Sequence, residues 1–180
     1  MGLLRMHDSN LSSTPSTTGL GAVVDLGFRT AYRVAHRMLR AYWKVRRPNT
    51  HGALIAVWHE GRLLLVKNSY RRHYTLPGGY VRPGESAAAA AQRELIEEVD
   101  LDLPRDRLRE VYSRIYQFEN RFDKVTIVEV DVDQPPVFEV DNREVVWASF
   151  ETPDAILRRP IVPHLQDYLR ERSDRFTSDA

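Results

Sequence analysis

The chain has 180 residues, of which 42% are hydrophobic and 28% charged, and it contains no cysteine. This composition suits one globular domain with a short appendage, and it excludes disulfide frameworks, cysteine-based metal centres and thiol catalysis. The formal net charge of +1 hides an uneven distribution, because residues 25–49 hold seven basic side chains and one acidic one. A basic segment therefore precedes an acidic remainder.

Residues 1–24 are predicted to form a disordered tail, because residues 9–18 are mostly Ser and Thr. The nearby apolar stretch, residues 19–28, is interrupted by Asp25, which argues against a secretory signal. Met6 stands where a myristoylation signal has Ser or Thr. No apolar run reaches the roughly 18 residues of a membrane span, so we expect a cytoplasmic protein.

A basic amphipathic helix is predicted for residues 25–48, with Asp25 as its N-cap and Pro48 as its end. Apolar side chains recur on one side at alternating steps of four and three: Phe28, Tyr32, Ala35, Leu39 and Tyr42. We favour burial of this stripe against the chain's own domain or against a second copy in a homodimer. Contact of the basic side with nucleic acid or an anionic membrane is the less favoured alternative.

From Thr50 the pattern changes to short strands around one central helix, which predicts an α/β (α+β) domain over residues 50–172 and a loose tail over 173–180. Strands are expected at 53–58, 62–66, 108–118, 125–132 and 145–150, with helices at 152–157 and 162–170. The first two strands are separated by a short turn at 59–61, which indicates a hairpin.

The stretch from Leu76 to Leu101 carries the chemistry. Two glycine-containing turns lead into a block of alanines, which favours a helix. Glu85 stands at the start of this helix, where a negative charge suits the helix dipole. At 100° per residue, three carboxylates share a sector about 100° wide. They belong to Glu94, Glu97 and Glu98. Arg93 lies one turn from Glu97, within reach of an ion pair.

A solvated charged face is the ordinary explanation for such a pattern. The Gly-Gly loop, together with the apolar side of the helix that carries Leu95 and Val99, favours a different explanation. In it, the carboxylates lie at the edge of a hydrophobic core. Oxygen-only ligands in this number fit Mg²⁺ or Mn²⁺ better than zinc.

The order Gly79, five residues, Glu85, seven residues and then residues 93–101 (RELIEEVDL) resembles the Nudix box. The resemblance covers 23 residues, and Asp100 is the single departure, because the family has Gly there. That Gly ends the helix in a left-handed conformation, which Asp tolerates better than most residues. The resemblance implies an α/β/α sandwich around a mixed β-sheet, with the basic helix as an N-terminal addition.

The resemblance also implies divalent-metal-dependent hydrolysis of a diphosphate bond in a nucleoside diphosphate linked to another moiety. The implied ligands of Mg²⁺ or Mn²⁺ are the Gly79 carbonyl, Glu85, Glu94, Glu97 and Glu98. Arg93 would orient the glutamates. The general base would be a box glutamate or an acid on a later loop, for which Glu144 is our candidate.

Three residues before the Gly-Gly loop are candidates for holding substrate. Arg71 and Arg72 could grip phosphates, and Tyr74 could stack on a base. The alternative function is a catalytically idle Nudix-like module that binds a nucleotide or a protein. The sequence retains all four box glutamates, and this favours the enzyme over the idle module.

Overall fold

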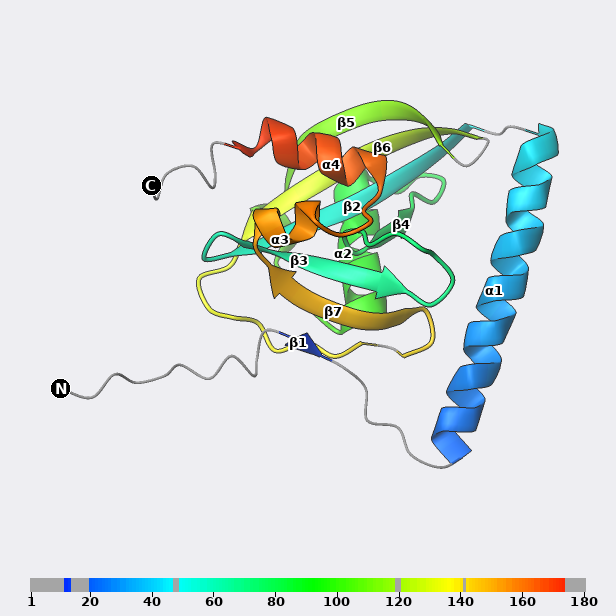
Figure 1. The fold of residues 1–180 in the computed structure, drawn as a ribbon. Helices are drawn as coiled ribbons and strands as arrows, with labels where there is room; N and C mark the ends of the chain where they lie inside the picture. Colours follow the sequence, from blue (N-terminus) through cyan, green and yellow to red (C-terminus); the bar gives the residue numbers. More distant parts are fainter. Residues whose placement is uncertain (1–11, 14–19, 47–48, 119–120, 141, 174–180) are drawn as a thin grey trace.

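The computed structural model describes residues 12–13, 20–46, 49–118, 121–140 and 142–173 (Figure 1). Its centre is one mixed sheet in the order β1-β7-β3-β2-β6-β5, with β4 beside β2. The strands are β1 Ser12–Ser13, β2 Asn49–His59, β3 Arg62–Asn68, β4 Gly78–Tyr80, β5 Arg109–Phe118, β6 Arg121–Asp131 and β7 Val145–Glu151. Only β2 and β6 pair in parallel among the described strands.

Helices cover both faces of this sheet (Figure 1). They are α1 Leu20–Arg46, α2 Ala87–Val99, the short 3₁₀ helix η2 Arg105–Arg107, α3 Pro153–Leu157 and α4 Pro163–Glu171. The buried side chains of β2 alternate: Ala53, Ile55 and Val57 pack in the cluster with α2, and Leu54, Ala56 and Trp58 in the cluster with α3 and α4. Because successive strand residues point to opposite faces, β2 supplies both cores. The predicted α/β/α sandwich is confirmed.

The β2–β3 hairpin turns through Glu60 and Gly61, whose φ angles of 45° and 70° fit the turn that tight hairpins prefer. The two strands then diverge, and the chain from Thr75 to Tyr80 runs between them. The Val66 amide donates to the Thr75 carbonyl at 2.8 Å, and the Ile55 amide donates to the Pro77 carbonyl at 2.9 Å. This insertion brings the Gly-Gly loop beside α2.

Helix α2 begins at Ala87, two residues after Glu85, which the sequence placed at its start. Ser86 is the N-cap and its side chain accepts the Ala89 amide at 3.2 Å, so Glu85 lies just outside the helix. At the other end Asp100 adopts the predicted left-handed conformation, with φ 52° and ψ 37°, and its amide donates to the Ile96 carbonyl at 3.0 Å.

Replacing Asp100 by glycine is expected to raise the free energy of unfolding by about 1 kcal/mol, because glycine adopts the left-handed conformation without the Cβ penalty. The change also removes a negative charge from the C-terminal end of a helix dipole. Urea denaturation measures the difference. A loss of stability in Asp100→Gly would show that the aspartate side chain makes a stabilising contact instead.

Helix α1 begins at Leu20, five residues before the predicted start, so Asp25 lies inside the helix and is not its N-cap. The Asp25 carboxylate is instead paired with Arg143, with 3.6 Å between Oδ1 and Nε. The prediction of a disordered tail over 1–24 is therefore wrong for residues 20–24, and also for Ser12–Ser13, which pair with β7. The rest of that segment and residues 174–180 lie outside the described residues.

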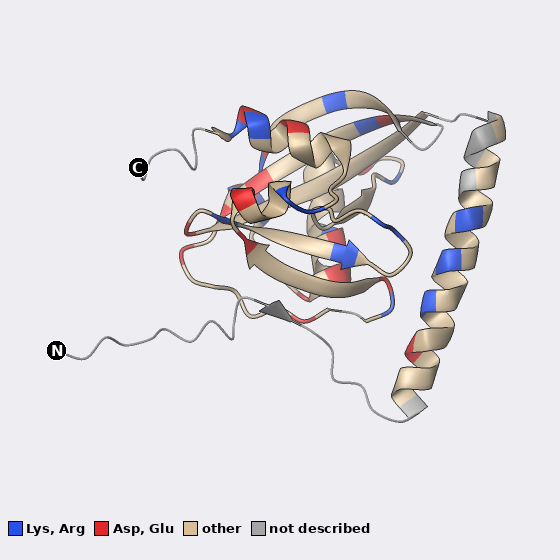
Figure 2. Ribbon diagram, in the orientation of Figure 1, with Lys and Arg blue, Asp and Glu red and all other residues tan. Residues whose placement is uncertain are grey.

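The apolar stripe of α1 is divided between two environments. Phe28 lies under the Arg143 guanidinium, 4.5 Å from the ring centroid, yet is 44% exposed, and Tyr32 stacks on Tyr70. Leu39 and Tyr42 are also exposed. Basic residues recur at intervals along this helix (Figure 2). Phe28 and Tyr32 thus contact the domain, but the predicted burial of the stripe is not found, because Phe28, Leu39 and Tyr42 are all exposed. A homodimer contact through this stripe stays a prediction. Among the described helices, none is long and apolar enough to cross a membrane.

Candidate active site

Helix α2 places its three box glutamates in three different environments. The exposed fraction of the side chain is 17% for Glu94 and 53% for Glu97, and Glu98 is 4% exposed. The order follows from the helix geometry, because Leu95 and Val99 are fully buried against the sheet and Glu98 lies next to that buried side. A buried carboxylate beside an exposed one indicates a site at the edge of the core.

Glu98 is held by two groups from outside its own helix. The Gly78 amide donates to Oε2 at 2.9 Å, and the Asn68 amide nitrogen donates to Oε1 at 3.4 Å. Burial raises the pKa of the Glu98 carboxyl well above its usual range, and the negative charges of Glu144 and Glu94 act in the same direction. The Gly78 amide and the Arg71 guanidinium oppose this rise. Arg71 and Glu144 therefore lie within electrostatic reach of Glu98.

Arg93 ties the other carboxylates together. Its guanidinium makes a two-pronged ion pair with Glu85, at 3.1 and 3.2 Å, and a short contact with Glu94 Oε1. The predicted pair with Glu97 is present at 3.5 Å. The guanidinium also donates to the Tyr80 carbonyl at 3.1 Å, which joins α2 to β4. Hydrogen bonding by Arg93 lowers the pKa of Glu85, whereas burial raises the pKa of Glu94.

The two glycines of the loop are both required by close contacts. A Cβ on Gly78 would lie 2.3 Å from the Ala53 carbonyl oxygen, and the φ angle of Gly78 is +148°. A Cβ on Gly79 would lie 2.5 Å from the Glu94 carboxylate. The Glu94 carboxylate thus uses the space that the missing side chain of Gly79 leaves open.

The donor chemistry of this cluster fits a hard divalent cation. All of its candidate ligands are oxygen atoms, which hard cations prefer. Glu98 is buried, so ionising its carboxyl group is costly unless a positive charge lies near it. Within the described part of the chain, no three acidic or histidine side chains already converge as a metal site. The reason is local, since Arg93 holds Glu85 and Glu94, and Gly78 and Asn68 hold Glu98.

Glu144 enters the site from a loop that precedes β7. The Tyr70 hydroxyl donates to Glu144 Oε1 at 2.5 Å, and the Ser69 amide donates to the Glu144 carbonyl at 2.7 Å. Ser69 Oγ also donates to the Arg143 carbonyl at 2.9 Å. Tyr70 and Asn68 carried no sequence signal for these contacts, because their partners are distant in the chain.

The three candidate substrate residues are placed differently. The Arg71 guanidinium lies 5.7 Å from the centroid of the Tyr70 ring, and its positive charge opposes the rise in the pKa of Glu98. The side chain of Arg72 is exposed, and its carbonyl accepts the Lys67 ammonium. Tyr74 packs in the cluster on the α3 and α4 face, with Arg159 5.0 Å from its ring centroid and Trp147 edge-on at 5.3 Å. A base stacking on Tyr74 would compete with these neighbours.

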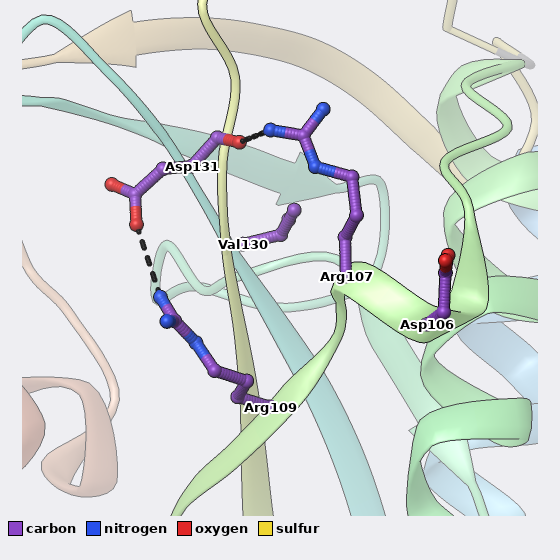
Figure 3. A pocket seen from close by; sticks show the side chains of 5 residues that line it. All are labelled: Asp106, Arg107, Arg109, Val130 and Asp131. Carbon is purple, nitrogen blue, oxygen red and sulfur yellow. Dashed lines mark hydrogen bonds and ion pairs between the residues drawn. The ribbon is translucent and has the colours of Figure 1, made fainter.

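A cavity of about 270 Å³ lies elsewhere, between η2 and the end of β6 (Figure 3). Both of its arginines are already paired. Arg107 donates to the Asp131 carbonyl at 2.7 Å, and Arg109 lies 3.4 Å from the Asp131 carboxylate. None of the box carboxylates lines it, so it is not the site that the sequence predicted.

The family model of the NUDIX domain matches residues 48–171, which is more than two thirds of the chain. The chain belongs to the NUDIX family. The matched range contains α2, the Gly-Gly loop and Glu144, whereas all of α1 lies outside it.

Comparison with individual proteins agrees with this assignment. A candidate 8-oxo-dGTP diphosphatase of Bacillus subtilis (strain 168) is 42% identical over 66 residues, which are 36% of this chain and 44% of that protein. The matched part thus spans less than half of that relative. The MutT protein of Methanosarcina mazei Go1 superposes with a TM-score of 0.61 at 19% identity, over 75% of this chain and 99% of that one. A C. elegans Ap4A hydrolase complex superposes with a TM-score of 0.59 at 20% identity, over 69% of this chain and 96% of that one. These two likenesses show the NUDIX fold.

Proposed function

We propose that this NUDIX protein hydrolyses a diphosphate bond in a nucleoside diphosphate linked to another moiety, and that it needs Mg²⁺ or Mn²⁺. The observation that carries the proposal is the cluster of three box carboxylates around Arg93, with the buried Glu98 on the same helix bound by the amide of a Gly-Gly loop that closely approaches its neighbours. An idle binding module has no need for a buried carboxylate such as Glu98, which destabilises the metal-free protein.

The residues that would hold the cation are the Gly79 carbonyl, Glu85, Glu94, Glu97 and Glu98. A bound divalent ion neutralises diphosphate oxygens and lowers the pKa of a coordinated water. The chain's own contribution is to place the ligands: Arg93 orients Glu85 and Glu94, and the Gly78 amide orients Glu98. Such preorganisation is what makes a site of this kind effective.

Glu144 is the proposed general base, because it is an acid on a separate loop within electrostatic reach of the box carboxylates. In this role it accepts the proton of the attacking water, while the Tyr70 hydrogen bond fixes one carboxylate oxygen and leaves the other for that proton. Glu97 and Glu98 are the alternative acceptors.

The substrate class rests on the diphosphate chemistry and on the names of the relatives, an 8-oxo-dGTP diphosphatase and an Ap4A hydrolase, both of which concern nucleotides with phosphoanhydride bonds. Arg71 is proposed to bind the phosphates, with Arg72 following it on the same loop. Tyr74 is not proposed for base contact, because it packs on the α3 and α4 face of the sheet, away from α2.

A screen for the release of nucleoside monophosphate, measured by chromatography, tests the proposal. Nucleotide sugars, dinucleotides and oxidised nucleoside triphosphates are each incubated with Mg²⁺ and with Mn²⁺, and Glu97→Gln serves as the inactive control. Cation-dependent release by the wild-type protein is the expected result. If the wild-type protein releases no more nucleoside monophosphate than Glu97→Gln from any substrate, the enzymatic proposal is overturned and the idle module is favoured.

Arg71→Ala is expected to raise KM for the preferred substrate about tenfold or more, because a lost charge-assisted hydrogen bond to phosphate weakens binding by roughly 1.5–3 kcal/mol. Steady-state kinetics measures the change. Arg158→Ala, at an exposed arginine after α3, controls for the loss of one positive charge. Equal KM values in the two variants would remove Arg71 from the substrate site.

A further inference from the structure

Helix α1 touches the NUDIX domain mainly at the two loops that carry Tyr70 and Glu144 (Figure 1). Arg29 Nε donates to the Asn142 carbonyl at 2.8 Å, and Arg33 Nε donates to the Ser69 carbonyl at 3.2 Å. One loop follows β3 and the other precedes β7, and one helix binds both. The helix is therefore attached beside the proposed base.

Tyr70 is the residue at which α1 and Glu144 meet. Its ring stacks on Tyr32, with 6.0 Å between centroids and 18° between planes, and lies 4.8 Å from the His36 ring. The Arg71 guanidinium lies 5.7 Å from the centroid of the same ring. Since the hydroxyl donates to Glu144 Oε1, the orientation of that carboxylate depends on where the ring is held.

We propose that α1 positions the general base: Tyr32 and His36 hold the Tyr70 ring, and the Tyr70 hydroxyl holds Glu144. This inference rests on the proposed function, in which Glu144 is the base. It assigns a role to a helix that lies outside the matched NUDIX domain. Tyr70, Tyr32 and His36 are then positioning residues, because they act through Glu144.

The chemistry of the contact suits this role. Burial raises the pKa of the Tyr70 hydroxyl, so it stays protonated and remains a donor at neutral pH. A phenol that donates to one oxygen removes the rotational freedom of the carboxylate, and a misplacement of about 1 Å in a catalytic group can cost a hundredfold in rate. Without the rings of α1, Tyr70 would lose the aromatic contacts on that side.

Kinetics of point variants in the full chain test the proposal. Tyr70→Phe keeps the ring and removes the hydroxyl, and we expect kcat to fall about tenfold with KM within twofold of wild type. Tyr32→Ala should give a smaller fall of the same kind, and Tyr32→Phe should restore kcat because the stacked ring returns. Tyr42→Ala, an exposed tyrosine on the same helix, should match wild type.

Amide hydrogen exchange supplies a readout that does not depend on activity. Exchange in peptides covering residues 69–74 and 142–146 should accelerate severalfold in Tyr32→Ala and stay unchanged in Tyr42→Ala. Wild-type kcat in both Tyr70→Phe and Tyr32→Ala, or unchanged exchange in Tyr32→Ala, overturns the inference while the proposed function stands. A wild-type protein without activity overturns the proposed function, and the exchange experiment still reports whether α1 holds the loops.

Discussion

Exchange of Glu98 for glutamine is expected to lower kcat about a hundredfold or more and, in the metal-free protein, to raise the free energy of unfolding at neutral pH. The loss of activity follows if Glu98 is a metal ligand, because a neutral amide is a poorer ligand for a hard cation. The gain in stability follows from burial, since glutamine fills nearly the same volume without a charge. The Gly78 amide keeps an oxygen acceptor in this variant.

The sign of the pH dependence follows from the raised pKa of Glu98. In the unfolded chain the carboxyl titrates near 4.3, and in the folded protein it binds its proton more tightly. The folded state therefore has the most favourable contribution from Glu98 below about pH 4.3, and this contribution is lost as pH rises through the folded pKa. The stability advantage of Glu98→Gln should accordingly grow as pH increases.

Urea denaturation in the presence of a chelator, at pH 5 and at pH 8, measures this growth. Glu97→Gln is the matched control, because its carboxylate is more than half exposed and its replacement relieves little burial. Added Mg²⁺ should then stabilise wild type more than Glu98→Gln, since the cation binds only the folded site. A Glu98→Gln protein that is less stable than wild type at pH 8 would contradict this account.

Gly79→Ala is expected to lose activity about a hundredfold while still folding. The added Cβ would lie 2.5 Å from the Glu94 carboxylate, which is the far end of a flexible side chain and can swing away. That movement removes a proposed ligand from its place but leaves the sheet intact. Gly78→Ala should instead impair folding, because its Cβ would lie 2.3 Å from a backbone carbonyl and its φ of +148° suits glycine alone.

Mn²⁺ titration calorimetry and thermal unfolding separate the two glycine variants. Weaker Mn²⁺ binding with a nearly unchanged Tm is the result for Gly79→Ala, and a large drop in Tm is the result for Gly78→Ala. Gly27→Ala in α1, where a Cβ meets nothing within 4 Å, should gain about 0.5–1 kcal/mol from helix propensity and keep wild-type binding. Full Mn²⁺ affinity in Gly79→Ala would remove Glu94 from the proposed ligands.

The sequence alone was sufficient for features that depend on residues near each other in the chain. The period of 3.6 in α2 determined that Arg93 reaches Glu97 and that Leu95 faces the sheet. The left-handed exit at Asp100 and the strand alternation in β2 have the same local origin. The resemblance to the Nudix family added the expectation that Glu144 acts as the general base, which no local sequence pattern supports.

Tertiary structure decided what depends on groups that meet across the fold. Helical spacing placed Glu98 next to the side of Leu95 and Val99 and Glu97 away from it, but it could not show what would bind the buried carboxylate. The Gly-Gly loop inserted between β2 and β3 supplies the Gly78 amide that binds Glu98, whereas Glu97 stays in solvent. The Tyr70–Glu144 hydrogen bond joins residues 74 positions apart, and α1 binds the loops of both. Burial and pairing set the pKa of a carboxylate, and they exist only after distant segments have packed.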